Sequence, residues 1–182
     1  MNANKKLLET AIDLVKLLNK EADKRLPQEI ADAVKLHSTL AVGSAWIPVP
    51  GADVAAGSAN IWSMYIRINN KIGIPVKDNI IKTIGAGVAT NLTSYIAVSG
   101  VASALKFIPG IGTLGGAIIM SASLYAVTLA SGFVYLKALT ALARKSGGSL
   151  NISELPKAVN DVLKEKNLIK NFIDEAKKEY KK

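Results

Sequence analysis

The chain has 182 residues, of which 49% are hydrophobic and 20% are charged, with a formal net charge of +9 and no cysteine. These values exclude disulfide and thiol chemistry, and they fit one domain with a larger apolar share than proteins surrounded by water usually have. The positive charge does not indicate nucleic acid, because the lysines of the C-terminal tail alternate with acidic residues and no nucleic-acid-binding motif occurs. Anionic lipid explains the charge more simply.

Residues 4–20 have the periodicity of an amphipathic helix, with leucine and alanine on one face and charged side chains on the other. A second helix is expected to start near Pro27, a residue favoured in a first turn, and to run toward Ala45. We therefore assign residues 1–35 to an N-terminal region of amphipathic helices.

A group of helix-breaking residues follows, namely Pro48, Pro50 and Gly51. Asp53 is expected to cap the next helix, over residues 54–69, by accepting backbone N–H bonds. The alternative interpretation of Asp53 is a proton or ion site, because it is an acid in apolar surroundings. The uncharged stretch before the break, residues 38–52, and the helix after it are each too short to span a bilayer. We therefore expect a re-entrant or interfacial pair of short helices.

Three aromatic residues in this region are candidates for the depth of the lipid headgroups. They are Trp46, Trp62 and Tyr65. Ordinary core packing is the alternative.

The centre of the chain predicts a hydrophobic helical hairpin over residues 83–136. Residues 83–105 carry no charge, and after Lys106 residues 107–136 carry none either. A helix of 23 residues is about 34 Å long, which is enough to cross a hydrocarbon core of about 30 Å. The turn between the two arms contains the helix-breaking residues Pro109, Gly110 and Gly112.

Small residues recur at helical spacing in the second arm, where they would let helices approach closely. The positions are Gly112, Gly116, Ala122, Ala126 and Ala130. The first arm instead carries polar side chains between Thr90 and Ser99. Exposing these polar groups to lipid on a single helix would be unfavourable. We therefore expect this arm to be buried among helices or in a homo-oligomer.

Basic residues flank the hairpin on both sides, while its turn carries only Lys106. They are Arg67, Lys71, Lys77, Lys82, Lys137, Arg144 and Lys145. The positive-inside rule then places both termini on the cytoplasmic side of a membrane. A fully cytoplasmic location is the alternative.

Residues 146–182 form a linker, Ser146–Ser149, and a C-terminal helical arm that we expect Ser153 to cap. A kink near Lys166 and Asn167 would divide the arm. Its apolar stripe would dock on the bundle itself or on a partner.

No residue pattern indicates catalysis, a metal or a cofactor. Gly110-x-Gly112-x-x-Gly115 has the letters of a dinucleotide fingerprint, but no strand precedes it and no acid follows at about 20 residues. His37 is the only histidine and has no second ligand at metal spacing.

The two helix breaks, P-x-P-x-x-D at 48–53 and I-P-G-I-G at 108–112, are followed by a small-residue run from Gly115 to Gly132. With these motifs, residues 36–145 resemble the bacterial YcjF-like domain of unknown function, which is also found as a C-terminal hairpin on some Era-like GTPases. The resemblance implies an inner-membrane hairpin protein with a link to a GTPase and to envelope stress. It implies no catalytic residue, and a GTPase partner would be a separate chain.

We therefore expect an all-α, membrane-associated helical bundle with a central hydrophobic hairpin, in which residues 36–145 form the core. Its expected function is non-enzymatic, as an anchor or scaffold for a cytosolic partner. A pore-forming or membrane-remodelling oligomer is one alternative. A soluble bundle that binds an apolar ligand is the other.

Overall fold

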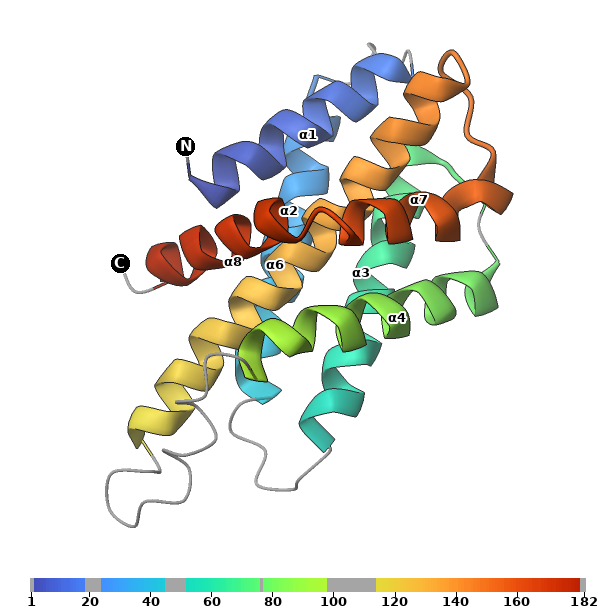
Figure 1. Ribbon diagram of the computed structural model, residues 1–182. Helices are drawn as coiled ribbons and strands as arrows, with labels where there is room; N and C mark the ends of the chain where they lie inside the picture. The colour runs from blue at the N-terminus through green and yellow to red at the C-terminus, as the bar shows by residue number, and fades with distance from the viewer. Residues whose placement is uncertain (1, 19–23, 45–51, 76, 98–113, 181–182) are drawn as a thin grey trace.

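The computed structural model of the chain describes residues 2–18, 24–44, 52–75, 77–97 and 114–180. Within these ranges all regular structure is helical, which confirms the all-α expectation (Figure 1). The helices are α1 (Ala3–Leu17), α2 (Leu26–Ser44), α3 (Ala52–Ile72), α4 (Asp78–Ala97), α6 (Leu114–Lys145), a 3-10 turn (Ile152–Glu154), α7 (Leu155–Leu163) and α8 (Lys166–Tyr180).

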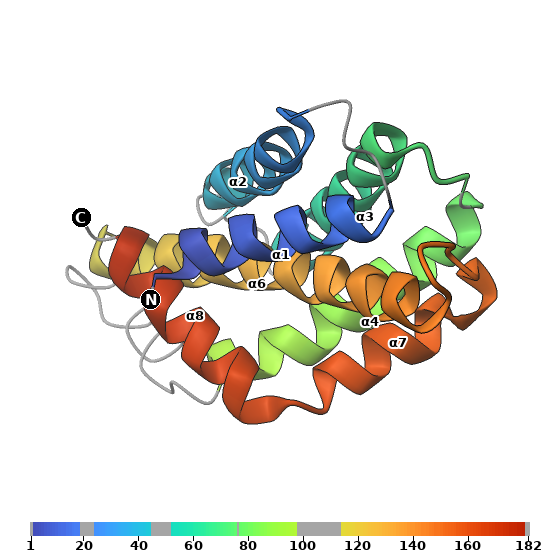
Figure 2. The ribbon, with the colours of Figure 1, turned by 90° about the horizontal axis from the view of Figure 1, so that it is seen from above.

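Helix α6 lies at the centre of the bundle and contacts α1, α2, α3, α4, α7 and α8 (Figures 1 and 2). Every side chain from 126 to 136 is buried. A helix that is apolar all round is stable only when it is surrounded, and here the neighbouring helices surround it.

Among the described residues, one helix segment is long and apolar enough to cross a membrane, Met120–Lys145. In the bundle, 89% of its most apolar window is buried by protein. Core helices of water-soluble proteins meet the same criterion of length and composition, so this segment is weak evidence for a membrane span.

The helices around α6 are amphipathic. On α1, Leu7, Ala11 and Leu14 are fully buried, while Glu9 and Asp13 face outward. On α8, Ile169 and Phe172 are fully buried, and Phe172 stacks on Phe133 of α6 with ring centroids 4.4 Å apart. The apolar stripe of the C-terminal arm therefore docks on its own bundle.

Glu179 of α8 joins the two ends of the described chain. Its carboxylate accepts hydrogen bonds from the Ala3 backbone N–H at 2.8 Å and from Asn4 Nδ2 at 2.8 Å. The first turn of α1 is also capped by Asn2, whose Oδ1 accepts from Lys5 N at 2.8 Å. A carboxylate at a helix N-terminus satisfies free N–H groups and complements the helix dipole.

The arms of the expected hairpin differ from the prediction. Helix α6 continues past residue 136 to Lys145, because Leu139 and Leu142 still face the core. Helix α4 contacts α6 but lies on the surface, and its polar residues Thr90 and Asn91 are exposed rather than buried among helices. Within the single chain these polar groups occupy the outward face of α4, so the alternative of burial among the helices of the same chain is wrong, and burial in a homo-oligomer stays a prediction.

The region on either side of residues 45–51 was expected to form two short re-entrant helices. Helix α2, Leu26–Ser44, matches the helix expected from near Pro27 toward Ala45, and α3, Ala52–Ile72, extends beyond the expected residues 54–69 at both ends. The two helices pack on each other and on α6. Tyr65 of α3 is completely buried, so core packing, not headgroup depth, describes its place.

The expected linker at 146–149 is a hydrogen-bonded turn at the end of α6. Gly147 and Gly148 have φ of 60° and 96°, a left-handed conformation that favours glycine, and Gly148 N donates to Ala143 O at 2.8 Å. Asn151, rather than Ser153, caps the following turn, because its Oδ1 accepts from Ser153 N and Oγ.

Candidate functional site

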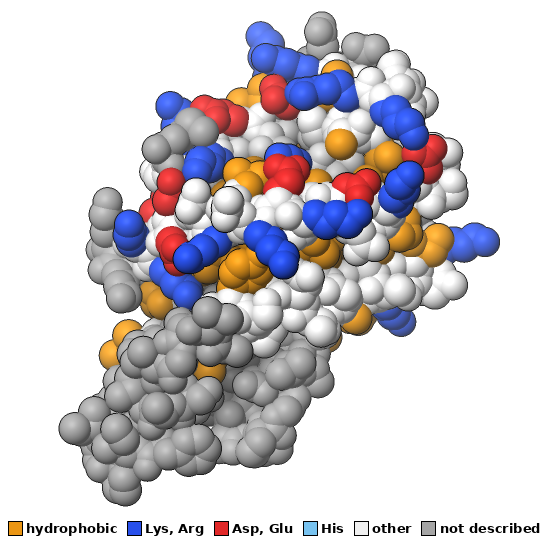
Figure 3. Space-filling model, viewed as in Figure 1, with side chains coloured by type: hydrophobic (Ala, Val, Ile, Leu, Met, Phe, Trp, Pro, Cys, Tyr) orange, Lys and Arg blue, Asp and Glu red, His pale blue; other side chains and the backbone are white. Residues whose placement is uncertain are grey.

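Four helices bring nearly uncharged segments to the same end of the bundle, at the lower left of Figure 1. The segments are residues 38–44 of α2, 52–63 of α3, 86–97 of α4 and 114–124 of α6, which we call the apolar end. Asp53 is the single charged residue in them. The rest of the described bundle, which includes α1, α7 and α8, is the charged half, and Figure 3 shows basic and acidic side chains gathered over these helices.

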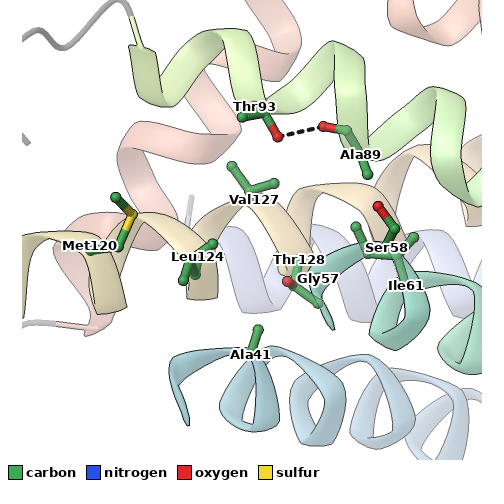
Figure 4. Close-up of a pocket in the computed structure, with 10 residues that line it drawn as sticks. All are labelled: Ala41, Gly57, Ser58, Ile61, Ala89, Thr93, Met120, Leu124, Val127 and Thr128. Carbon is green, nitrogen blue, oxygen red and sulfur yellow. Dashed lines mark hydrogen bonds between the residues drawn. The ribbon is translucent and has the colours of Figure 1, made fainter. Parts of the chain in front are cut away.

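A small pocket lies where the four segments meet (Figure 4). Its volume is about 90 Å³, and most of its wall is apolar, with Ile61, Leu124 and Val127 among the lining residues. Thr93 also lines it, but its hydroxyl donates to Ala89 O at 2.6 Å and is therefore occupied. The other hydroxyl groups in the wall are those of Ser58 and Thr128.

The large apolar side chains that the described structure leaves exposed lie at or beside this end. Leu36 and Leu40 are one helical turn apart on α2, with 44% and 58% of their surfaces exposed. Ile118, in the first turns of α6, is 56% exposed. Single exposed apolar side chains are common, whereas adjacent ones, such as Leu36 and Leu40, are more typical of a surface that contacts another apolar phase.

A buried polar network holds the middle of the bundle together. Tyr65 donates to Ser131 O at 3.0 Å, and Tyr135 donates to Asn69 Oδ1 at 2.8 Å. Burial raises the pKa of both tyrosine hydroxyls well above the ordinary value of 10.0, because the phenolate would be desolvated. Asn69 Nδ2 is buried and has no hydrogen-bond partner among the described residues.

His37 joins α2 to α3 at the border of the apolar end. The Asn60 side-chain amide donates from Nδ2 to His37 O at 2.7 Å, which turns its Oδ1 toward His37 Nδ1, also at 2.7 Å. Because an amide oxygen only accepts, His37 Nδ1 must carry the proton. The histidine is a buried inter-helix contact rather than a residue of an open helix face.

Most of the predicted helix-breaking residues lie outside the described ranges. These are Pro48, Pro50, Gly51, Pro109, Gly110 and Gly112. Asp53 is the second residue of α3, so this helix starts one residue before the expected cap, and the side chain of Asp53 is not among those described.

The predicted packing residues lie in α6. Ala122, Ala126 and Ala130 are buried, at 3%, 0% and 1% exposure, and the side of α6 that they occupy faces protein. Gly116 is in the first turn of α6, where the surroundings are not described. The closest approach to α6 involves Gly132, where a Cβ would overlap the side chain of Val34 on α2.

The predicted flanking basic residues mostly pair with acids elsewhere in the chain. Lys71 bonds Glu29 at 2.8 Å, Lys137 bonds Glu165 at 2.8 Å, Lys145 bonds Glu154 at 2.6 Å, and Arg144 lies 3.7 Å from Asp13. Lys82 stands over the ring of Trp62, 5.1 Å from its centroid. Arg67 and Lys77 are exposed.

No cluster of metal-ligating side chains occurs in the residues that the structure describes. The features that sequence reasoning missed are the tyrosine network and the pocket. The spacing of Tyr65 and Asn69, one turn apart on one helix, was visible in the sequence. Their partner Tyr135 lies 66 residues after Asn69 and is found only in the fold.

Comparison with protein-family models, with curated proteins and with solved structures finds no match for this chain. The fold and site therefore define the class: an all-α bundle around one apolar helix, with charge concentrated on one half and an apolar end on the other.

Proposed function

We propose that this protein is a non-enzymatic, membrane-associated helical bundle that docks on an anionic bilayer through its apolar end. The observation that carries the proposal is the convergence of four nearly uncharged helix ends beside the exposed side chains of Leu36, Leu40 and Ile118. The charged half would stay in the cytoplasm, together with both ends of the described chain, and would hold a partner protein. The YcjF-like resemblance favours a GTPase as that partner.

The expected binding free energies favour peripheral docking that needs anionic lipid. Fully burying one leucine or isoleucine stabilises by about 1.5–3 kcal/mol, so three half-exposed side chains contribute roughly 3 kcal/mol. A dissociation constant of 1 mM already requires about 4.1 kcal/mol. Each lysine near an anionic surface adds about 1 kcal/mol, so a few basic residues at the border of the apolar end would supply what the apolar contact lacks.

The test is co-flotation of the full chain with vesicles of phosphatidylcholine, with and without phosphatidylglycerol. We expect flotation with the anionic vesicles, weaker flotation with neutral ones, and loss of flotation in the variant Leu40→Asp/Ile118→Asp. Ser149→Asp, an exposed position in the charged half, adds an acid away from the apolar end and should still float. Flotation of Leu40→Asp/Ile118→Asp at the level of the unaltered protein, or no flotation of the unaltered protein, would contradict the proposal.

One observation favours a second function, the insertion of α6 to form a pore or to remodel the bilayer. The Met120–Lys145 segment has the length and composition of a span and is sheathed by amphipathic helices that could open. Leakage of dye from vesicles that bind the protein would support this function, and docking without leakage would contradict it.

The third expectation, a carrier of an apolar ligand, has less support. A cavity of about 150 Å³ holds one benzene molecule, and the pocket of the apolar end is about 90 Å³. It has no room for an acyl chain.

A further inference from the structure

A groove runs between the last turns of α4 and one face of α8. Helix α8 contributes Lys166, Lys170 and Lys177, which lie at i, i+4 and i+11 and therefore share one side of the helix, together with Asp174. The volume of the groove is about 570 Å³, within the range of sites for small molecules and headgroups. Its formal charge is positive, with three lysines against one aspartate.

The three lysines have no carboxylate within ion-pair distance among the described residues. Elsewhere on the bundle, Lys71 and Lys137 each have a carboxylate oxygen at 2.8 Å. The groove therefore has a net positive charge that no ion pair among the described residues offsets, which favours an anion as its ligand.

The α4 wall of the groove is polar but uncharged. It consists of Asn91, Ser94 and Tyr95. The Ser94 hydroxyl donates to Asn91 O at 2.6 Å, whereas the Asn91 amide and the Tyr95 hydroxyl bring donor groups of their own. Lysine and neutral donors together are the groups that bind phosphate oxygens.

The position of the groove identifies the source of the phosphate. Asn91, Ser94 and Tyr95 belong to the apolar end, and α8 belongs to the charged half, so the groove lies on the border between them. When the apolar end enters hydrocarbon, this border is at the depth of the lipid headgroups. Figure 3 shows basic side chains along this face, above the uncharged part of the surface.

We propose that the groove between α4 and α8 binds the phosphate of an anionic lipid headgroup. This inference rests on the proposed docking of the apolar end. It adds a specific contact to an otherwise general attraction between a basic protein and an anionic surface.

The test is a titration of the full chain with vesicles of phosphatidylcholine and phosphatidylglycerol. We expect Lys166→Gln/Lys170→Gln to bind about 30-fold more weakly than the unaltered protein, since each lysine is worth about fivefold at an anionic surface. The matched control is Lys16→Gln/Lys157→Gln, which removes the same charge from exposed positions on α1 and α7. We expect it to change binding less than threefold.

The outcomes separate the two proposals. If the unaltered protein binds the vesicles and the two double variants lose affinity equally, the groove proposal is wrong and docking stands. If the unaltered protein binds no vesicle, both fail. In a parallel titration with inorganic phosphate alone, followed by amide chemical shifts of residues 166–177, saturation without any vesicle binding would identify a soluble anion and overturn the lipid assignment.

Discussion

Tyr65 of α3 and Tyr135 of α6 stack face to face inside the bundle, with ring centroids 4.0 Å apart and planes inclined by 9°. Both are fully buried, and each hydroxyl donates to the helix of the other, Tyr65 to Ser131 O and Tyr135 to Asn69 Oδ1. The pair fixes the register of α3 against α6.

Replacing Tyr135 by phenylalanine should destabilise the fold by about 1–3 kcal/mol, because it leaves Asn69 Oδ1 buried without its donor. Asn69 Nδ2 already lacks a partner among the described residues. The double variant Tyr135→Phe/Asn69→Leu removes both polar groups and should lose less than the single variant. Urea unfolding of the unaltered protein, both single variants and the double variant completes the cycle, and additive losses would show that the two side chains are not coupled.

Stability should fall at high pH because of the same two tyrosines. Burial raises their pKa above the ordinary 10.0, so in this range the unfolded chain releases protons that the folded protein keeps. Their contribution is therefore complete below pH 10 and is lost as the pH rises from 10 toward the raised pKa, by about 1.4 kcal/mol per pH unit for each tyrosine. Urea unfolding at several pH values should give a flatter profile for Tyr65→Phe/Tyr135→Phe. Equal slopes above pH 10 would contradict the assignment.

Gly132→Ala should destabilise the protein by about 1–3 kcal/mol, because the added methyl group would overlap the Val34 side chain of α2. The matched control is Gly87→Ala on the exposed face of α4, where nothing lies within 4 Å of the new Cβ. There the better helix propensity of alanine should stabilise by about 1 kcal/mol. Thermal unfolding followed by circular dichroism checks both signs, and a loss at position 87 as large as at 132 would show that the α2–α6 approach is not the cause.

A second pair of glycines, Gly57 and Gly85, tests the surroundings of the pocket of the apolar end. Gly57 lines it, and a Cβ at this position would meet no atom within 4 Å, so Gly57→Ala should stabilise by about 1 kcal/mol without weakening vesicle binding. Gly85 of α4 faces Trp62, whose Cβ would lie 3.0 Å from a new Cβ, so Gly85→Ala should not gain stability. If Gly57→Ala lost vesicle binding while remaining folded, the pocket would be part of the docking site.

Much of the helical layout could be predicted from the sequence, because the periodic positions of α1, α2, α7 and α8 show which face each helix buries. Whether lipid or protein surrounds α6 could not be predicted from the sequence. An apolar helix has the same composition whether lipid or protein covers it, and only the neighbours of residues 126–136 distinguish the two. The exposed face of α4 could be predicted in part from the sequence. Thr83, Thr90 and Ser94 lie on one face of a helix, and that face is exposed in the structure.

The groove between α4 and α8 could be predicted from the sequence only in part. The spacing of Lys166, Lys170 and Lys177 places them on one side of a helix by sequence alone. Tyr95, which forms the opposite wall, lies 71 residues before Lys166 in the chain. It meets the lysines only because of the way α8 crosses the bundle. Charge patterns within a helix are local, whereas a site between helices is a property of the packing.

The most direct test of the account compares the two ends of α6 in the presence of a bilayer. The chain has no cysteine, so a single cysteine at Ile118 or at Arg144 can carry an environment-sensitive fluorophore. The two positions are 56% and 66% exposed, and they are separated along the helix by about 39 Å. With anionic vesicles, the account predicts a blue shift of the label at 118 and none at 144. A shift at both positions, or at neither, would contradict docking through the apolar end.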